Sequence, residues 1–458
     1  MRTWIKVTLL IVLALGLSWG GAIWFWRATN RMPATQDLVL YLVMLPLLLL
    51  LAFWFGRKLI AVIAAAPAAA AADPAAPPPA IKAAPLAVLG AALRTPHGAS
   101  ADELSGALLD NKARAELDDR LIDDNGFPVM TARCDDAEDA GLQQEITEWF
   151  ALKGVEDFAL EEHQWRALSM ATSVAIELAS AATGTLMPQE GVPPMLHLMP
   201  ILPPDWTLDE RRAGGLWLQH VISQSGWPAA RIALAAEVPA DPRAASPCAV
   251  LRRLVHQGAL SGLPQVAMVV AGASFLSNAC INQWEGNATL FAPTRPQGLI
   301  PGEGAAGLLL TDLRQAQAID GAVYVTLELE ADARRHNSAD QAKKTDAKLL
   351  GAMTEKLLAA APLAADKIAM LVADTGHRTS RVLELMEMTS AALAHLDADT
   401  EVLRTGGACG TCGAVPFVAA LALARHHAIE LEAPVLCISN EDPYRRSAVL
   451  VRPAAALS

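Results

Sequence analysis

The sequence predicts a large α/β domain preceded by two transmembrane helices and a spacer. Three observations predict this arrangement. Two long uncharged apolar runs lie within the first 58 residues of the 458-residue chain. A stretch composed mostly of alanine and proline follows them. Behind it, short apolar runs alternate with amphipathic ones to the end of the chain, a pattern typical of helices covering both faces of a largely parallel sheet.

The two apolar runs are Val7–Trp26 and Leu38–Gly56, and neither contains a charged residue. Each has roughly the 20 residues that a helix needs to cross the hydrocarbon core. Aromatic residues close both runs, as is common at a membrane–water interface. A cleaved signal peptide followed by one anchor is the alternative. However, the first run is longer than a typical signal core, and no clear small-residue cleavage site follows Trp26. We therefore expect residues 1–59 to form a transmembrane hairpin.

The basic residues of the hairpin predict its orientation. Four flank its two ends and two lie in its turn: Arg2, Lys6, Arg57 and Lys58, against Arg27 and Arg31. Because positive residues favour the cytoplasmic side, this bias places the soluble domain in the cytoplasm, at a bacterial inner membrane. The cysteine content agrees, since six cysteines in a long domain do not resemble a disulfide framework.

Charge is distributed unevenly along the chain. Residues 1–58 contain six of the 36 basic and one of the 48 acidic residues, so the remainder carries 30 basic and 47 acidic residues, a net charge of −17. A domain this acidic is a poor binder of nucleic acid or of an anionic lipid surface. We expect its partners to be proteins or small molecules.

Residues 60–85 are predicted to be a linker, because residues 64–85 are almost wholly alanine and proline and cannot form a core. No second linker of comparable length follows. The apolar runs predicted to be buried strands are Leu86–Leu89, Val266–Ala271, Gly307–Leu310, Ala322–Leu329, Ile368–Val372 and Val435–Ser439. The predicted helices are Gln164–Ala181, Cys248–Leu260, Asp346–Ala360, Arg381–His395 and Val415–His426.

Several glycine-containing turns follow these apolar runs. The segments that carry them are LAVLGAALRTPHGASADEL (86–104), QVAMVVAGAS (265–274), GLIPGEGAAGLLL (298–310), KIAMLVADTGHRTSR (367–381), GGACGTCGAVPFVAALALA (406–424) and the closing VLCISNEDPYRRSAVLVRP (435–453). In this order and at these spacings they resemble the β-ketoacyl synthases of the thiolase-like superfamily. The third is the closest match, because that family has the same Pro-Gly-Glu-Gly-Ala-Ala loop before a buried strand.

The resemblance covers residues 86–453 and implies a thiolase-like fold. Such a fold has two similar halves, which we assign to residues 86–320 and 321–458. Each half would contain a mixed five-stranded sheet, and the two would pack into a five-layered α-β-α-β-α domain. The expected fold class is therefore a thiolase-like five-layered domain preceded by two transmembrane helices.

The resemblance also implies that the catalytic residues are lost. The family attacks an acyl thioester with a cysteine at a helix N-terminus and uses two histidines to support decarboxylation and the oxyanion. The first histidine position is occupied by Asp374 and the second by Ala408. Counting back from Gly262 places the nucleophile at residue 245 or 246, and a short gap would restore it at Cys248. We expect a degenerate site with no cofactor and no metal.

Several other residues are of types that carry chemistry in proteins. Cys409 and Cys412 form a Cys-x-x-Cys pair, which suits a redox site, half of a zinc site, or small residues filling a glycine loop. No second ligand pair is evident, since His426 and His427 lie at the far end of a predicted helix. Cys248 could be the nucleophile, but the alternative is a structural role as a small buried residue at the start of a helix. Glu303 is expected to pair structurally, and residues 332–348 are expected to form a solvated helix face with its entry loop.

Three functions remain open from the sequence. The first is a non-catalytic protein, held at the membrane, that binds other proteins. The combination of anchor and degenerate domain resembles the type VI lipase adapter family, which delivers a lipase effector to the secretion machinery. The second is a divergent acyl-condensing enzyme that uses Cys248. The third is a scaffold for acyl carrier protein or acyl chains. The site, rather than the fold, must decide among them.

Overall fold

The computed structural model describes residues 85–454, apart from 156–157, 189, 236–245, 262–263, 330–331 and 342–344, together with Trp19 and Arg27. The chain divides into two compact units, Met1–Ile81 and Lys82–Ser458. The predicted hairpin and linker lie outside the described residues, except for Trp19, Arg27 and Pro85. Within the described part of the chain, no helix is both long enough and apolar enough to cross a membrane.

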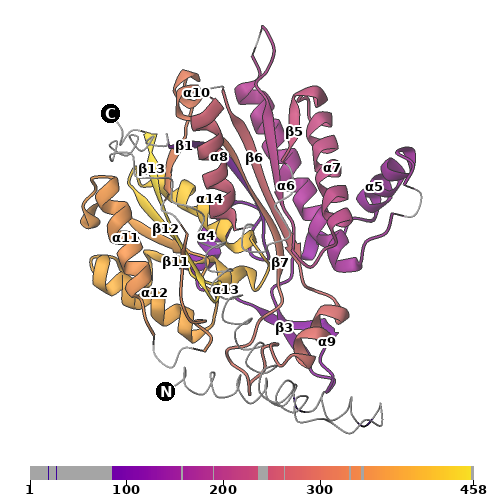
Figure 1. Cartoon of the computed structure of the whole chain (residues 1–458), viewed down its shortest axis with the longest axis vertical. Coiled ribbons are helices and arrows are strands. Elements are labelled where there is room, and N and C mark those ends of the chain that lie inside the picture. Colours follow the sequence, from indigo (N-terminus) through magenta and orange to yellow (C-terminus); the bar gives the residue numbers. More distant parts are fainter. Residues whose placement is uncertain are drawn as a thin grey trace. The chain divides into compact units, whose positions relative to one another are not determined.

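Two sets of five strands form the framework of the second unit (Figure 1). The first set is β1 (Leu86–Arg94), β4 (Leu196–Ile201), β5 (Ile232–Leu234), β6 (Val266–Ser274) and β7 (Glu303–Asp312). The second set is β8 (Val325–Leu329), β10 (Met370–Ala373), β11 (Val402–Arg404), β12 (Val435–Ser439) and β13 (Arg445–Pro453). The short β9 (Ala333–Arg334) pairs with β13, and β2 (Glu116–Ile122) forms a separate hairpin with β3 (Pro128–Thr131).

The two sets repeat one topology. Their spatial orders are β5-β4-β6-β7-β1 and β11-β10-β12-β13-β8, so in both the order is third, second, fourth, fifth, first. In both, the second strand is parallel to the third and fourth, and the fifth is antiparallel to its two neighbours. The sets join where β1 pairs with β8 over Leu86–Val88. The chain therefore contains two similar α/β halves.

Helices cover both outer faces and fill the space between the halves. The helices are α4 (Ala101–Leu109), α5 (Ala140–Leu152), α6 (Glu162–Leu186), α7 (Leu208–Gln224), α8 (Pro247–Ser261), α9 (Asn278–Gly286), α10 (Leu313–Ala318), α11 (Lys348–Ala360), α12 (Thr379–Ala392), α13 (Thr405–Cys409) and α14 (Val415–Glu430). One apolar cluster joins α6 and α7 to the first set of strands. A second joins α11 and α12 to the second set, and a third lies between the sets around α8 and α14.

Alternation along the strands explains these clusters. On β6, Val269 and Ala271 belong to the central cluster, whereas Met268 and Val270 belong to the outer one. Successive side chains of a strand point to opposite faces, so a strand covered on both faces must be apolar throughout. All nine residues of β6 are buried, as this requires. The order of layers is α-β-α-β-α, and the layered α/β architecture predicted from the sequence is confirmed.

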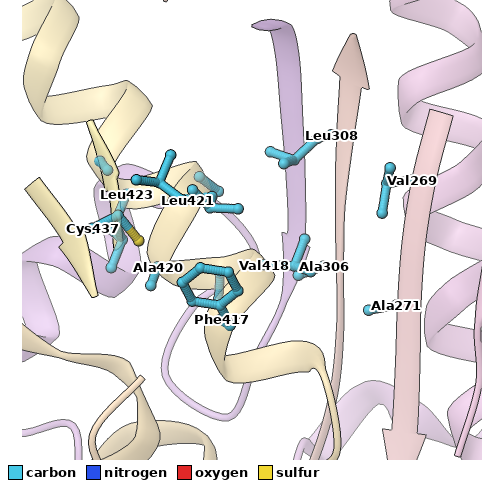
Figure 2. Close-up of a cluster of buried hydrophobic side chains, with 14 of the residues drawn as sticks. Val269, Ala271, Ala306, Leu308, Phe417, Val418, Ala420, Leu421, Leu423 and Cys437 are labelled. Atoms are coloured by element: carbon cyan, nitrogen blue, oxygen red, sulfur yellow. The ribbon is translucent and has the colours of Figure 1, made fainter. Parts of the chain in front are cut away.

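Helix α14 forms the middle of the core. It is apolar on all sides until its last turns, and a helix of that kind is stable only when it is surrounded by protein. Figure 2 shows side chains of α14, among them Phe417 and Leu421, between Cys437 of β12 on one side and Ala306 and Leu308 of β7 on the other. This helix therefore holds the two halves together.

All six predicted strands and all five predicted helices are present, with ends that differ by a few residues. The expectation that residues 332–348 form a solvated helix face with its entry loop is wrong for the residues of this segment that the structure describes. That segment contains β9, and the next helix begins only at Lys348. Its charged side chains are also not simply solvated, because Asp340 pairs with Arg378 and Arg381.

Candidate functional site

The three positions implied by the resemblance lie in the central layer or at its edge. Cys248 is the second residue of α8, Ala408 lies in α13, and both belong to the central cluster. Asp374 directly follows β10. The thiol of Cys437 on β12 is also buried in this region, and burial raises its pKa well above the ordinary value, with smaller contributions from Asp374 and Cys248. The fold thus gathers residues that are far apart in the sequence.

The carboxylate of Asp374 is buried and fastens the loop that follows β12. One of its oxygens accepts a hydrogen bond from the Ser439 hydroxyl. The other accepts from the backbone nitrogen atoms of Asn440, at 2.8 Å, and of Glu441, at 3.1 Å. Burial raises the pKa of Asp374 to about 6, although these hydrogen bonds act in the opposite direction. All three donors come from residues 439–441, so the visible role of this carboxylate is to position that loop.

Two further hydrogen bonds hold the same loop, residues 439–441, against the end of β10. The Thr375 hydroxyl donates to Oδ1 of Asn440 at 2.6 Å, and the Gly376 nitrogen donates to Glu441 at 2.8 Å. Gly406 of α13 lies directly against this turn. A Cβ atom at Gly406 would lie 2.1 Å from the carbonyl oxygen of Asp374. Only glycine permits this approach, which brings α13, and with it Ala408, against the end of β10.

Asp374→Asn should change the pH dependence of stability. Folding raises the pKa of Asp374 from its ordinary value of 3.8 to about 6. Protonation of this carboxyl group therefore stabilises the folded chain. The full contribution is present below pH 3.8 and is lost as pH rises through about 6. The asparagine does not titrate but keeps an oxygen acceptor. Relative to wild type, the variant should therefore gain up to about 3 kcal/mol between pH 4 and pH 7.5.

Denaturant unfolding of the full-length chain at several pH values across this range measures the effect. Asp366→Asn is the matched control, because Asp366 is exposed and the substitution is the same. A stability difference between wild type and Asp374→Asn that stays constant with pH would contradict this assignment.

Cys248 lies at the start of α8 but is not exposed there. Only 1% of the surface of Cys248 is exposed. Ser246 caps the helix by accepting the Ala249 backbone N–H at 3.1 Å, and its hydroxyl donates to Asp332 at 2.9 Å. Ser447 donates to the other oxygen of Asp332 at 2.5 Å. Burial and then the nearby Asp332 raise the pKa of the Cys248 thiol well above its ordinary value. A nucleophilic cysteine requires the opposite shift.

Ala408 is fully buried and begins a group of small buried residues. Cys409 and Cys412, which follow it, are also fully buried, and the pKa of Cys412 is raised well above its ordinary value by burial and by Cys409. The thiols are free. A Cβ atom at Gly302 would lie 1.9 Å from the carbonyl oxygen of Cys409, so the loop before β7 packs directly on α13. This close packing fits the expectation that the cysteines fill space.

The expected pairing of Glu303 is observed, and its partner is Arg166 of α6. Arg166 donates to both carboxylate oxygens, from Nε at 2.8 Å and from Nη2 at 2.5 Å. The Cys134 nitrogen and the Ser274 hydroxyl donate to the same carboxylate at 2.8 Å and 2.9 Å. Every acceptor position of Glu303 is therefore occupied. The periodicity of the sequence places Arg166 on a buried helix face but does not reveal its partner.

His377 is the imidazole closest in sequence to Asp374, and its side chain lies against a different loop. Its ring contacts Phe291 edge-on, with 5.3 Å between centroids. Burial lowers the pKa of His377, so the ring is neutral near pH 7. Among the described residues, its buried Nε2 has no hydrogen-bond partner.

No protein-family model matches the chain, and no curated protein matches it in sequence. Solved structures do match. The ketosynthase from module 6 of the bacillaene synthase of Bacillus subtilis 168 is 12% identical with a TM-score of 0.54, over 80% of this chain and 72% of that one.

Two further structures cover 81% of this chain and 99% of their own. One is AntDE:AntF, a type II PKS acyl-carrier protein in complex with its ketosynthase, with 12% identity and a TM-score of 0.52. The other is a β-ketoacyl synthase from Burkholderia phymatum STM815, with 13% identity and a TM-score of 0.50. At such identities the likeness establishes the fold alone. The chain therefore has the thiolase-like fold of the ketosynthases.

Proposed function

We propose that this chain is a non-catalytic protein with a ketosynthase fold, and that it acts by binding another protein. The observation that carries the proposal is the state of the three positions at which the resemblance expects catalytic groups. Asp374 holds a loop with its carboxylate, Ala408 offers only a methyl group, and the Cys248 thiol is buried beside Asp332. None of these groups is suited to the role that its position has in a ketosynthase.

The chemistry of each position supports this proposal. An ionised carboxylate accepts hydrogen bonds and cannot donate one to a developing oxyanion. A methyl group donates nothing. A thiol with a raised pKa remains protonated near pH 7 and is a weak nucleophile. A fold that has lost its reactive groups retains its surface, and function in such a protein is a property of that surface.

Exposed apolar side chains on the β2–β3 hairpin also favour protein binding. Leu117 and Phe127 are each 66% exposed, and Ile122 is 52% exposed. Ile122 pairs with Pro128 across the hairpin, so the two side chains lie on one face. Exposed apolar groups concentrated on one small element are typical of interaction surfaces.

We extend the proposal to location and partner. The apolar runs within residues 1–59 would hold the domain at the cytoplasmic face of a bacterial inner membrane. A lipase effector of the type VI secretion system is the partner that this architecture suggests. Acyl carrier protein is the alternative, because one similar structure is a ketosynthase in complex with its carrier protein.

Replacing Cys248 with alanine should leave the partners of the protein unchanged. The measurement is quantitative mass spectrometry of proteins that co-purify with the full-length chain from solubilised membranes of the source bacterium. Residues 1–85 alone are the control for proteins that adhere to the membrane segment. The adapter proposal predicts one or a few proteins enriched equally by wild type and Cys248→Ala. No enrichment over the control would contradict it, and a partner lost only in Cys248→Ala would favour the enzyme.

A further inference from the structure

The last turn of α14 brings together three side chains that can bind a metal ion. Nε2 of His426 lies 3.4 Å from Oε2 of Glu430, and Nδ1 of His427 lies 3.5 Å from the same oxygen. All three donor atoms lie within 4.8 Å of one another. Donors bound to a tetrahedral zinc ion at 2.0–2.2 Å are separated by about 3.4 Å. The separations of the two histidine nitrogens from Oε2 of Glu430 therefore match those around one ion, and the nitrogens lie within 4.8 Å of each other.

A serine on a second helix holds the remaining nitrogen of His427. Nε2 of His427 lies 2.9 Å from the Ser105 hydroxyl, which comes from α4 and is buried. Histidines that bind metals usually donate their other ring N–H to such a partner, which fixes the orientation and tautomer of the ring. When Nε2–H donates to Ser105, Nδ1 directs its lone pair toward Glu430 and the space between the donors. The second helix thus orients this ligand.

The surroundings of these side chains favour a cation that arrives from solvent. The side chain of His427 is 5% exposed, whereas those of His426 and Glu430 are 27% and 62% exposed. One ligand is therefore held by the core while the others face solvent. The donors also lie at the C-terminus of a 16-residue helix, where the helix dipole and the last carbonyl groups stabilise positive charge.

We propose that His426, His427 and Glu430 bind a divalent transition-metal ion with the coordination preferences of Zn²⁺. Two imidazole nitrogens and one carboxylate oxygen suit such an ion better than Ca²⁺ or Mg²⁺, which prefer sites made of oxygen ligands. Three protein ligands leave a fourth position open to water or to a side chain of a bound protein. Within the described part of the chain, this is the one group of three such side chains whose donor atoms converge. The inference does not depend on the adapter proposal.

Zinc titration of the metal-free full-length chain, in competition with a chromogenic chelator, tests the site. Wild type should bind one equivalent. His426→Ala and Glu430→Gln should each weaken binding by at least about 100-fold, since even loss of a partner behind a ligand costs about 10–100-fold. Ser105→Ala should weaken it by about 10–100-fold for that reason. His336→Ala is the matched control, because it removes an exposed imidazole elsewhere and should have no effect.

Cobalt(II) identifies the ligands independently. Tetrahedral Co²⁺ bound to nitrogen and oxygen should give visible absorption without the intense near-ultraviolet band of a thiolate complex. That band would assign the metal to the cysteines instead. If His427→Ala does not fold, the two more exposed positions still decide the question. Absence of stoichiometric binding by wild type, or a site that survives both His426→Ala and Glu430→Gln, would overturn the proposal.

Discussion

Replacing Arg166 with methionine is expected to destabilise the folded chain by about 3–5 kcal/mol, enough to abolish folding if the native state is only marginally stable. Arg166 and Glu303 are 1% and 0% exposed, and their groups form two parallel hydrogen bonds. Methionine matches the arginine stem but leaves the carboxylate buried, and among the described residues only the Cys134 nitrogen and the Ser274 hydroxyl then donate to it. An uncompensated buried charge is among the most destabilising single changes in a protein.

A double-mutant cycle isolates the pair. Glu303→Gln alone should cost less than Arg166→Met, because Arg166 keeps its contacts with Glu138 and with the carbonyl of Cys134. Adding Glu303→Gln to Arg166→Met should restore part of the loss by removing the unpaired charge. Arg120→Met is the matched control, since Arg120 pairs with Glu138 at the surface and should contribute less than about 1 kcal/mol. Denaturant unfolding measures each value, and a loss below 1 kcal/mol for Arg166→Met would show that this pair is unimportant.

Incubation with acyl thioesters is expected to leave the mass of the full-length chain unchanged, with condensation about 10⁴–10⁶-fold slower than by a ketosynthase. The proposed loss of two oxyanion donors, at Asp374 and Ala408, predicts this difference, because each donor is worth on the order of 10²–10³ in rate. The raised pKa of Cys248 lowers the rate of acylation further, because the thiolate is the reactive form.

Intact-mass spectrometry after incubation with acyl carrier protein thioesters measures acylation directly. An active ketosynthase under the same conditions is the positive control, and Cys248→Ala is the matched variant. A stable adduct on wild type that is absent from Cys248→Ala would show that the site remains reactive. The divergent enzyme would then replace the adapter as the best hypothesis. An adduct that persists in Cys248→Ala would point to nonspecific acylation of another group.

Long apolar runs could be assigned from the sequence because burial on both faces leaves a strong local signal. β6 and α14 are of this kind, and because both are apolar on all sides, length rather than period distinguishes the 9-residue strand from the 16-residue helix. The sequence pattern does not predict β4, because Pro200 interrupts a mostly apolar run. In the structure, Pro200 lies beyond the last residue that β4 pairs with β5, so the missing N–H is tolerated there. The pattern does not predict α7 either, because Gly214 and Gly215 weaken the helical signal, although they allow close packing on Leu202 and Leu234.

The sequence by itself determined the layered α/β class, the order of most elements, and the residue types at Asp374, Ala408 and Cys248. These follow from local periodicity and from glycine loops whose spacing is visible along the chain. Only the tertiary structure decided what those residues contact. Asp374 meets residues 439–441, and Glu303 meets Arg166, which is 137 positions away. His427 meets Ser105 across 322 positions. Contacts between such distant residues depend on how the layers pack, and no local pattern encodes them.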